Sequence, residues 1–242
     1  MTPSPPHASL AMATPALHIH QPEAAEARSL SDQAYYRIRE LIVSLELPPG
    51  SLISERDLMH QFELGRTPVR EALRALARER LVEVYPRRGI FVSGIDVGDL
   101  AGLSEVRAVL ESEAARLAAE RASEDDRAEI AALLGELNGS AGELSDASGE
   151  LGERELIDLD QRIHRHIYRS AHSPFLEATL NEYYVLTLRI WFLALDKVAR
   201  LEDAVREHRE LLEAIRDGDP ERSADAMHRH VTGFEQAIRR VL

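Results

Sequence analysis

Cysteine is absent from the 242-residue chain. Its absence excludes a disulfide framework, a thiolate metal site and a cysteine nucleophile, so any metal must be bound by His, Asp or Glu. The chain also lacks an apolar run long enough to span a bilayer, and its N-terminal segment lacks the basic-then-apolar order of a secretory signal. We therefore expect a cytoplasmic protein with no membrane partner.

Basic residues are in the minority, 29 against 42 acidic ones, and the net charge is −13. This excess of acid argues against a protein that coats nucleic acid along its whole surface. The acid is unevenly spread, however: residues 29–95 hold ten arginines and nine acidic residues, whereas residues 96–242 hold 18 basic and 31 acidic residues. We therefore expect a disordered, proline-rich tail over residues 1–28, a small near-neutral domain over 29–95 and a larger acidic domain over 96–242.

The small domain has the element order of a winged helix-turn-helix. Apolar spacing predicts a helix from about Ala34 to Leu45, capped by Ser31 or Asp32 and stopped by the Pro48–Gly50 turn. Two further helices should follow, from Ser54 to Phe62 and from Thr67 or Pro68 to about Arg80. The strands of a hairpin should then run from Leu81 to Tyr85 and from Ile90 to Val92.

Arginines recur every fourth residue on the third helix, at Arg66, Arg70 and Arg74, so they share one face. An arginine row near the start of a helix can enter the major groove, and Arg87 and Arg88 at the hairpin tip can reach the minor groove or the backbone. The alternative is that these arginines are solvated and paired with nearby acidic residues, namely Glu63, Glu71 and Glu79.

The larger domain should be an all-helical bundle, because strand patterns are missing from it. We expect one helix to end near Arg121 and a loop over residues 138–152. The other helices should run over these ranges: Ser123 to Leu137, Glu153 to Ala171, Pro174 to Ala199, Leu201 to Asp217, and from the Gly218–Pro220 turn to Val241.

Asp160 and His164 lie four residues apart and therefore on one face of their helix, while His208 and His230 flank the Gly218–Pro220 turn at equal distances. Antiparallel helices joined by this turn should bring the two histidines opposite each other. One carboxylate and three imidazoles suit Zn²⁺, Ni²⁺ or Mn²⁺. The alternative for each histidine is a solvated or hydrogen-bonded core side chain. Asp158, His166 and His228 each lie two residues from one of these four positions, about 200° around the helix, so their side chains should point away from the metal site.

The segment from Tyr36 to Val92, which contains "PPGSLISERDL" and "GRTPVREALRALARERLVEVYPRRGIFV", resembles the DNA-binding domain of GntR-type bacterial transcription regulators. The resemblance implies contacts with operator DNA from the second helix, the start of the third helix and the wing, at Arg56, Arg66, Thr67, Arg70, Arg87, Arg88 and Gly89. Gly65 departs from the family, which usually has Ser or Thr there, so one phosphate contact is missing.

Residues 97–242 resemble the FCD effector domain of the FadR-like subfamily, through "D160-QRI-H164", "REH208-RELLEAIRDGD" and "ADAMHRH230". The resemblance implies that Asp160, His164, His208 and His230 bind a divalent ion, with Zn²⁺ as our first expectation, inside a ligand cavity. It also implies that Arg107 binds the carboxylate of an effector. The alternative for Arg107 is an exposed ion pair with Glu111.

The function we expect is that of a repressor, not an enzyme. A small carboxylate effector would bind at the metal and alter how a homodimer reads near-palindromic, double-stranded operator DNA. The Val106–Leu117 helix is our candidate for part of the dimer surface. Further pocket-wall candidates follow from helical position: Tyr183, Tyr184, Arg189 and Trp191. Two alternatives stay open: a helical domain that only dimerises, and a metal-dependent hydrolase.

Overall fold

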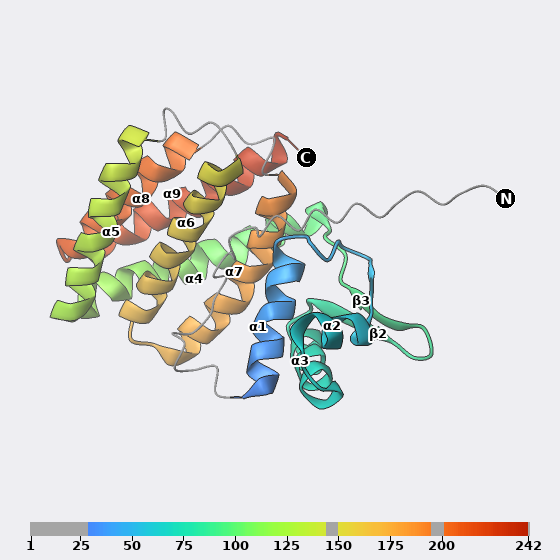
Figure 1. Ribbon diagram of the computed structural model, residues 1–242. Coiled ribbons are helices and arrows are strands. Elements are labelled where there is room, and N and C mark those ends of the chain that lie inside the picture. The colour runs from blue at the N-terminus through green and yellow to red at the C-terminus, as the bar shows by residue number, and fades with distance from the viewer. Residues whose placement is uncertain (1–28, 144–149, 195–200, 242) are drawn as a thin grey trace.

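A computed structural model describes residues 29–143, 150–194 and 201–241, with an N-terminal winged helix followed by a helical domain (Figure 1). The expected tail over residues 1–28 lies outside the described residues. Within the described ranges, no helix is long and apolar enough to cross a membrane.

The winged helix contains three helices and a small antiparallel sheet. The helices are α1 (Leu30–Val43), α2 (Glu55–Phe62) and α3 (Arg66–Arg78), and the strands are β1 (Leu52–Ile53), β2 (Val82–Tyr85) and β3 (Gly89–Val92). The strand order is β1-β3-β2, with β3 antiparallel to both neighbours. The expected hairpin is present, but β1 was not predicted, because two residues are too few to show an alternating pattern.

Two of the predicted helix starts are wrong by one or more residues. The cap of α1 is Ser29, whose side chain accepts from the Asp32 N–H, while the Asp32 side chain accepts from the Ser29 N–H. Asp32 is thus the reciprocal member of a capping box rather than the cap. Helix α3 begins at Arg66 after Gly65, which supplies no side-chain cap. Ser54 caps α2 as predicted, and Ser123 likewise precedes its helix and accepts from the Asp126 N–H.

The helical domain begins with a short 3-10 turn, η1 (Val97–Asp99), and continues through six helices in the described ranges. Their bounds are α4 (Leu100–Arg121), α5 (Glu124–Glu143), α6 (Glu150–Ser170), α7 (Pro174–Ala194), α8 (Leu201–Arg216) and α9 (Pro220–Arg239). The expected loop over residues 138–152 is too long, because α5 continues to Glu143 and α6 already starts at Glu150. Its centre, residues 144–149, lies outside the description.

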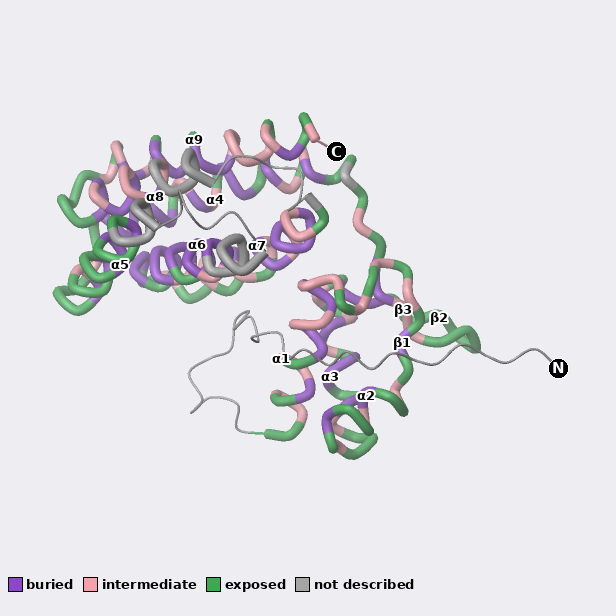
Figure 2. The backbone as a smooth tube through the Cα atoms, turned by 45° about the horizontal axis from the view of Figure 1, so that its top comes forward, coloured by how far each residue is buried: buried purple, intermediate pink, exposed green. Residues whose placement is uncertain are grey.

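Helix α4 lies along α9 and also contacts α6, α7 and α8, so it runs through the middle of the bundle. Helix α7 contacts α1 of the winged helix. One cluster of buried apolar residues extends from the winged helix into the helical domain, from Ile38 and Leu73 to Leu180 and Leu188. Figure 2 shows buried stretches on the helices of both domains. The two domains therefore share a continuous apolar core.

Candidate metal centre and DNA-reading surface

Three helices bring four predicted ligands together in the core of the helical domain. Asp160 and His164 project from α6, His208 from α8 and His230 from α9. All four are buried, and one ligand atom from each lies within 4.8 Å of the others. The structure therefore places the predicted set at one point, and a cluster of this composition could hold a metal ion.

The histidine rings are oriented so that their Nε2 atoms face the centre of the cluster. Nε2 of His164 lies 3.2 Å from Nε2 of His230, and Nε2 of His208 lies 3.0 Å from Oδ1 of Asp160. On the outer side, Nδ1 of His230 lies 3.1 Å from Oε2 of Glu207. Nδ1 of His164 lies 2.9 Å from Oε2 of Glu111. Carboxylates at Nδ1 favour a proton there and leave the Nε2 lone pairs directed inward.

A cation fits this arrangement better than protein groups alone. With the protons of both rings on Nδ1, the inward lone pairs of His164 and His230 would face each other at 3.2 Å and repel. Although Asp160 Oδ1 and His208 Nε2 are close, they are not aligned, and neither buried atom has a hydrogen-bond partner among the described residues. Ligand atoms of a tetrahedral zinc ion are separated by roughly 3.3 Å, which is near the spacing of both pairs.

The pKa values show how the buried charges are balanced. Burial raises the pKa of Asp160, but the imidazoles of His164, His208 and His230 outweigh it and hold that pKa well below its usual range. Burial likewise opposes ionisation of Glu111, yet Arg107 and His164 lower its pKa to about 2. Both carboxylates are therefore charged at neutral pH. Burial, aided by His208, lowers the pKa of His230 to about 4, so this ring is neutral there.

Arg107 lies beside the cluster but already has a partner. Its Nε donates to Oε1 of Glu111 at 2.5 Å, and the two side chains are only 4% and 0% exposed. The ion pair that we kept as an alternative is present, but the expectation that it is exposed is wrong. Its burial joins Arg107 through Glu111 to His164. The guanidinium also lies 5.7 Å from the ring centre of Tyr184.

The remaining candidates separate into two groups. Asp158 and His166 bind elsewhere, to Arg162 and to the Asp126 carbonyl respectively, and His228 is exposed, as their helical phase predicts. Of the pocket-wall candidates, Tyr184 donates from its hydroxyl to Oδ2 of Asp160. Others lie away from the cluster: Tyr183 and Arg189 line a different cavity, and Trp191 packs against Phe234.

Our reading of the sequence missed Glu207 as a partner of the cluster and saw Glu111 only as a partner of Arg107. Glu111 lies on α4, a helix without any predicted ligand, so no spacing on α6 could reveal it. Glu207 directly precedes His208, but it contacts His230 on the neighbouring helix. Both contacts depend on how the helices pack rather than on periodicity.

The residues predicted to contact DNA are exposed on α2, the first turns of α3 and the wing: Arg56, Arg66, Thr67, Arg70, Arg87, Arg88 and Gly89. The Arg56 side chain is 94% exposed. The expected alternative partners of the arginine row do not pair with it among the described residues, since Glu71 accepts from Ser31 and Glu79 from Tyr35. Instead Arg70 Nε donates to Oε2 of Glu55 at 2.8 Å.

The wing turn has a backbone that presents its two arginines. Arg87 and Gly89 have positive φ values of 66° and 114°. A side chain at Gly89 would be strained by this φ and would bring a Cβ within 2.8 Å of Leu52 Cδ1. Glycine therefore allows β3 to pack closely on β1 while the turn, with Arg87 and Arg88, stays exposed.

Comparison with known families finds a match for the winged helix and another for the helical domain. Residues 30–92 match the family described as "Bacterial regulatory proteins, gntR family", and residues 102–233 match the "FCD domain". An HTH-type transcriptional regulator from an unstable DNA locus of Streptomyces ambofaciens is 30% identical, over 86% of this chain and 84% of that protein.

The galactonate operon transcriptional repressor of Escherichia coli is 29% identical, over 78% of this chain and 89% of the repressor. Among solved structures, Escherichia coli McbR/YncC shares the fold with a TM-score of 0.75 at 22% identity. The structural match covers 88% of this chain and 98% of the McbR/YncC chain.

Removing two arginines from the start of α3 tests the DNA-reading surface. We expect Arg66→Ala with Arg70→Ala to weaken operator binding about 30-fold or more, because each loses a base or phosphate contact. Binding is measured by gel shift on a fragment that the wild-type protein selects from random DNA. Arg229→Ala with Arg239→Ala removes the same charge from exposed positions on α9 and should bind normally. Equal affinity in both double variants would show that α3 does not read DNA.

A second experiment tests the carboxylate behind His230. Glu207→Gln should weaken metal binding about 10- to 100-fold, because an amide orients the imidazole less well and carries no charge. Competition with a chelating dye measures the affinity. Glu210→Gln on the same helix is the control, since Glu210 is exposed and paired with Arg229. An unchanged affinity in Glu207→Gln would rule out a positioning role for this carboxylate.

Proposed function

The chain belongs to the GntR family of bacterial regulatory proteins and carries an FCD domain, and from this premise we propose that it is a repressor controlled by a small organic acid. The acid would bind at a divalent ion in the helical domain and change operator binding. The observation that carries the proposal is the convergence of four buried ligand atoms from α6, α8 and α9 in a chain with a winged helix.

We assign the ion to Asp160, His164, His208 and His230. Three imidazole nitrogens and one carboxylate oxygen suit Zn²⁺ first, with Ni²⁺ or Mn²⁺ as alternatives. Two carboxylates, Asp160 and Glu111, are buried in this neighbourhood, and Arg107, which pairs with Glu111, is the buried guanidinium beside them. The excess of negative charge is one that a bound cation would offset. When bound, the ion supplies Lewis acidity and an open coordination position for an anionic oxygen.

The protein groups around this position would select the ligand. Arg107 is held by Glu111, which raises the pKa of the guanidinium against the effect of burial and keeps it charged. It would add a positive charge for the carboxylate of the effector. Tyr184 fixes Asp160 through its hydroxyl. Support for an acidic ligand also comes from the galactonate operon repressor, whose name refers to a sugar acid.

Helix α7 would transmit binding to the winged helix. We place the boundary between the two domains at residues 95 and 96, so α7 belongs to the helical domain. Its Tyr184 binds Asp160 of the cluster, and the same helix contacts α1 of the winged helix. A ligand that prefers one arrangement of α6 and α7 shifts the population of domain orientations, and with it operator affinity.

We further propose a homodimer that reads a near-palindromic operator, because two half-sites need two recognition helices. On α4, the candidate dimer helix, Val109 is 69% exposed, which favours an apolar contact between subunits. A helical domain that serves only for dimerisation remains the competing function. The hydrolase alternative is not supported, since the relatives are transcriptional regulators.

Metal analysis and ligand screening test this proposal on the purified full chain. We expect about one divalent ion per chain by elemental analysis. A panel of hydroxy acids, amino acids and sugar acids is then screened by thermal shift. At least one acid should raise the Tm, change operator affinity and be recovered unchanged.

Two histidines on α9 give a matched pair of variants. His230→Ala should lose the ion and the thermal shift, whereas His228→Ala, exposed two residues away, should keep both. Chelator treatment of the wild-type chain should reproduce the loss. A chain that holds no metal and binds none of the acids would favour the dimerisation function, acid binding that is equal in both variants would show that the histidine cluster is not the acid site, and consumption of the acid would indicate an enzyme.

A further inference from the structure

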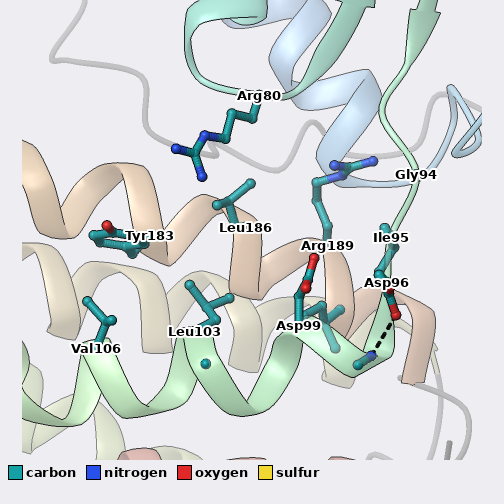
Figure 3. A pocket seen from close by; sticks show the side chains of 13 residues that line it. Arg80, Gly94, Ile95, Asp96, Asp99, Leu103, Val106, Tyr183, Leu186 and Arg189 are labelled. Atoms are coloured by element: carbon teal, nitrogen blue, oxygen red, sulfur yellow. Dashed lines mark hydrogen bonds between the residues drawn. The ribbon is translucent and has the colours of Figure 1, made fainter.

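A cavity lies where the winged helix meets the helical domain (Figure 3), and none of the four clustered ligand residues lines it. Its volume is about 480 Å³, within the range of small-molecule sites. The walls come from Arg80 between α3 and β2 of the winged helix, the connecting residues Gly94 to Asp96, the start of α4 and the second half of α7. Both domains and the segment that joins them thus contribute to one pocket.

Arg189 of α7 is the unusual residue of this wall. The residue is 2% exposed, and its Nη2 donates to the Ser93 carbonyl at 2.5 Å, while its Nε has no hydrogen-bond partner in the described part of the chain. Burial lowers the pKa of Arg189 to about 10, and no carboxylate contributes to this shift. An uncompensated buried guanidinium is costly, and an anion is the natural partner for it.

Arg80 adds a second guanidinium on the same side of the cavity, where it and Arg189 approach from different domains (Figure 3). Two acidic residues, Asp96 and Asp99, also line the cavity, but both are exposed, and Oδ1 of Asp96 accepts from the Gly98 N–H at 2.7 Å. The charges of the wall therefore sum to zero. This balance favours a ligand with a single negative charge over a dianion.

The rest of the lining is largely apolar, with Leu103 of α4 and Leu186 and Ile190 of α7. We propose that this interdomain cavity binds a small monocarboxylate, with its carboxylate between Arg189 and Arg80 and its apolar body against Leu103 and Leu186. Guanidinium groups bind carboxylates with charge-assisted hydrogen bonds, and the apolar wall excludes strongly hydrated anions.

A ligand at this position would touch both domains and the segment between them. It would favour whichever domain orientation keeps Arg80 and Arg189 at the wall of this cavity. The site is separate from the metal centre and does not depend on the function proposed there.

Hexanoate is the test probe, with hexan-1-ol as the uncharged analogue and inorganic phosphate as an anion without an apolar body. We expect the full-length chain to bind hexanoate and neither of the other two compounds. Calorimetry measures the affinity.

Three variants locate the site. Arg189→Gln and Arg80→Gln should each weaken hexanoate binding about tenfold or more. Gly102→Leu should block it by filling the cavity, because Gly102 lines the wall and an added Cβ meets no atom within 4 Å. Gly135→Leu, an exposed helical position with equally free space, should bind hexanoate as the wild type does.

His230→Ala separates this cavity from the metal centre. Hexanoate binding should survive in this variant even where metal and effector binding are lost. Loss of hexanoate binding in His230→Ala together with normal binding in Gly102→Leu would place the ligand at the histidine cluster and overturn the proposal. Equal binding of hexanoate and hexan-1-ol would overturn it as well, since the guanidinium groups would then play no part.

Discussion

The helical domain is organised around the cost of burying two carboxylates, Asp160 and Glu111, in a helical core. A buried charge is stable only if other groups replace the water it has lost. Arg107, Tyr184, His164 and His208 supply those contacts from four different helices. Arg107 pairs with Glu111 within α4, whereas the other three contacts each join two helices, so the charge network also sets how the bundle packs.

Helix α7 connects this network with the winged helix because its faces have different neighbours. Tyr184 faces Asp160 in the bundle core, whereas Arg189 holds the Ser93 carbonyl just after β3. Tyr183 and Leu186 line the interdomain cavity. A small rotation or shift of α7 would therefore change the surroundings of both proposed ligand positions at once. Ligands at either proposed position would therefore act on the winged helix through the same helix, α7.

Periodicity and turns predicted much of the structure. The four-residue spacing of Asp160 and His164 placed them on one helix face, and the turn at Gly218 brought His208 and His230 together. The position of Glu111 could not be found in the same way, because it follows from the packing of α4 against α6. The interdomain cavity depends on how the two domains dock. The start of α1 was predicted less well, since neighbouring Ser and Asp residues compete for the cap.

The continuous apolar core between the domains has a consequence for folding as well as for regulation. Apolar side chains of α7 and of the winged helix belong to one buried cluster. Separating the domains would expose these side chains to water, which ties their unfolding into one cooperative transition. A compound that binds only in the helical domain then also protects the winged helix from denaturation and proteolysis. With the proposed effector bound, the lifetime of the DNA-reading part would therefore rise with the concentration of that ligand.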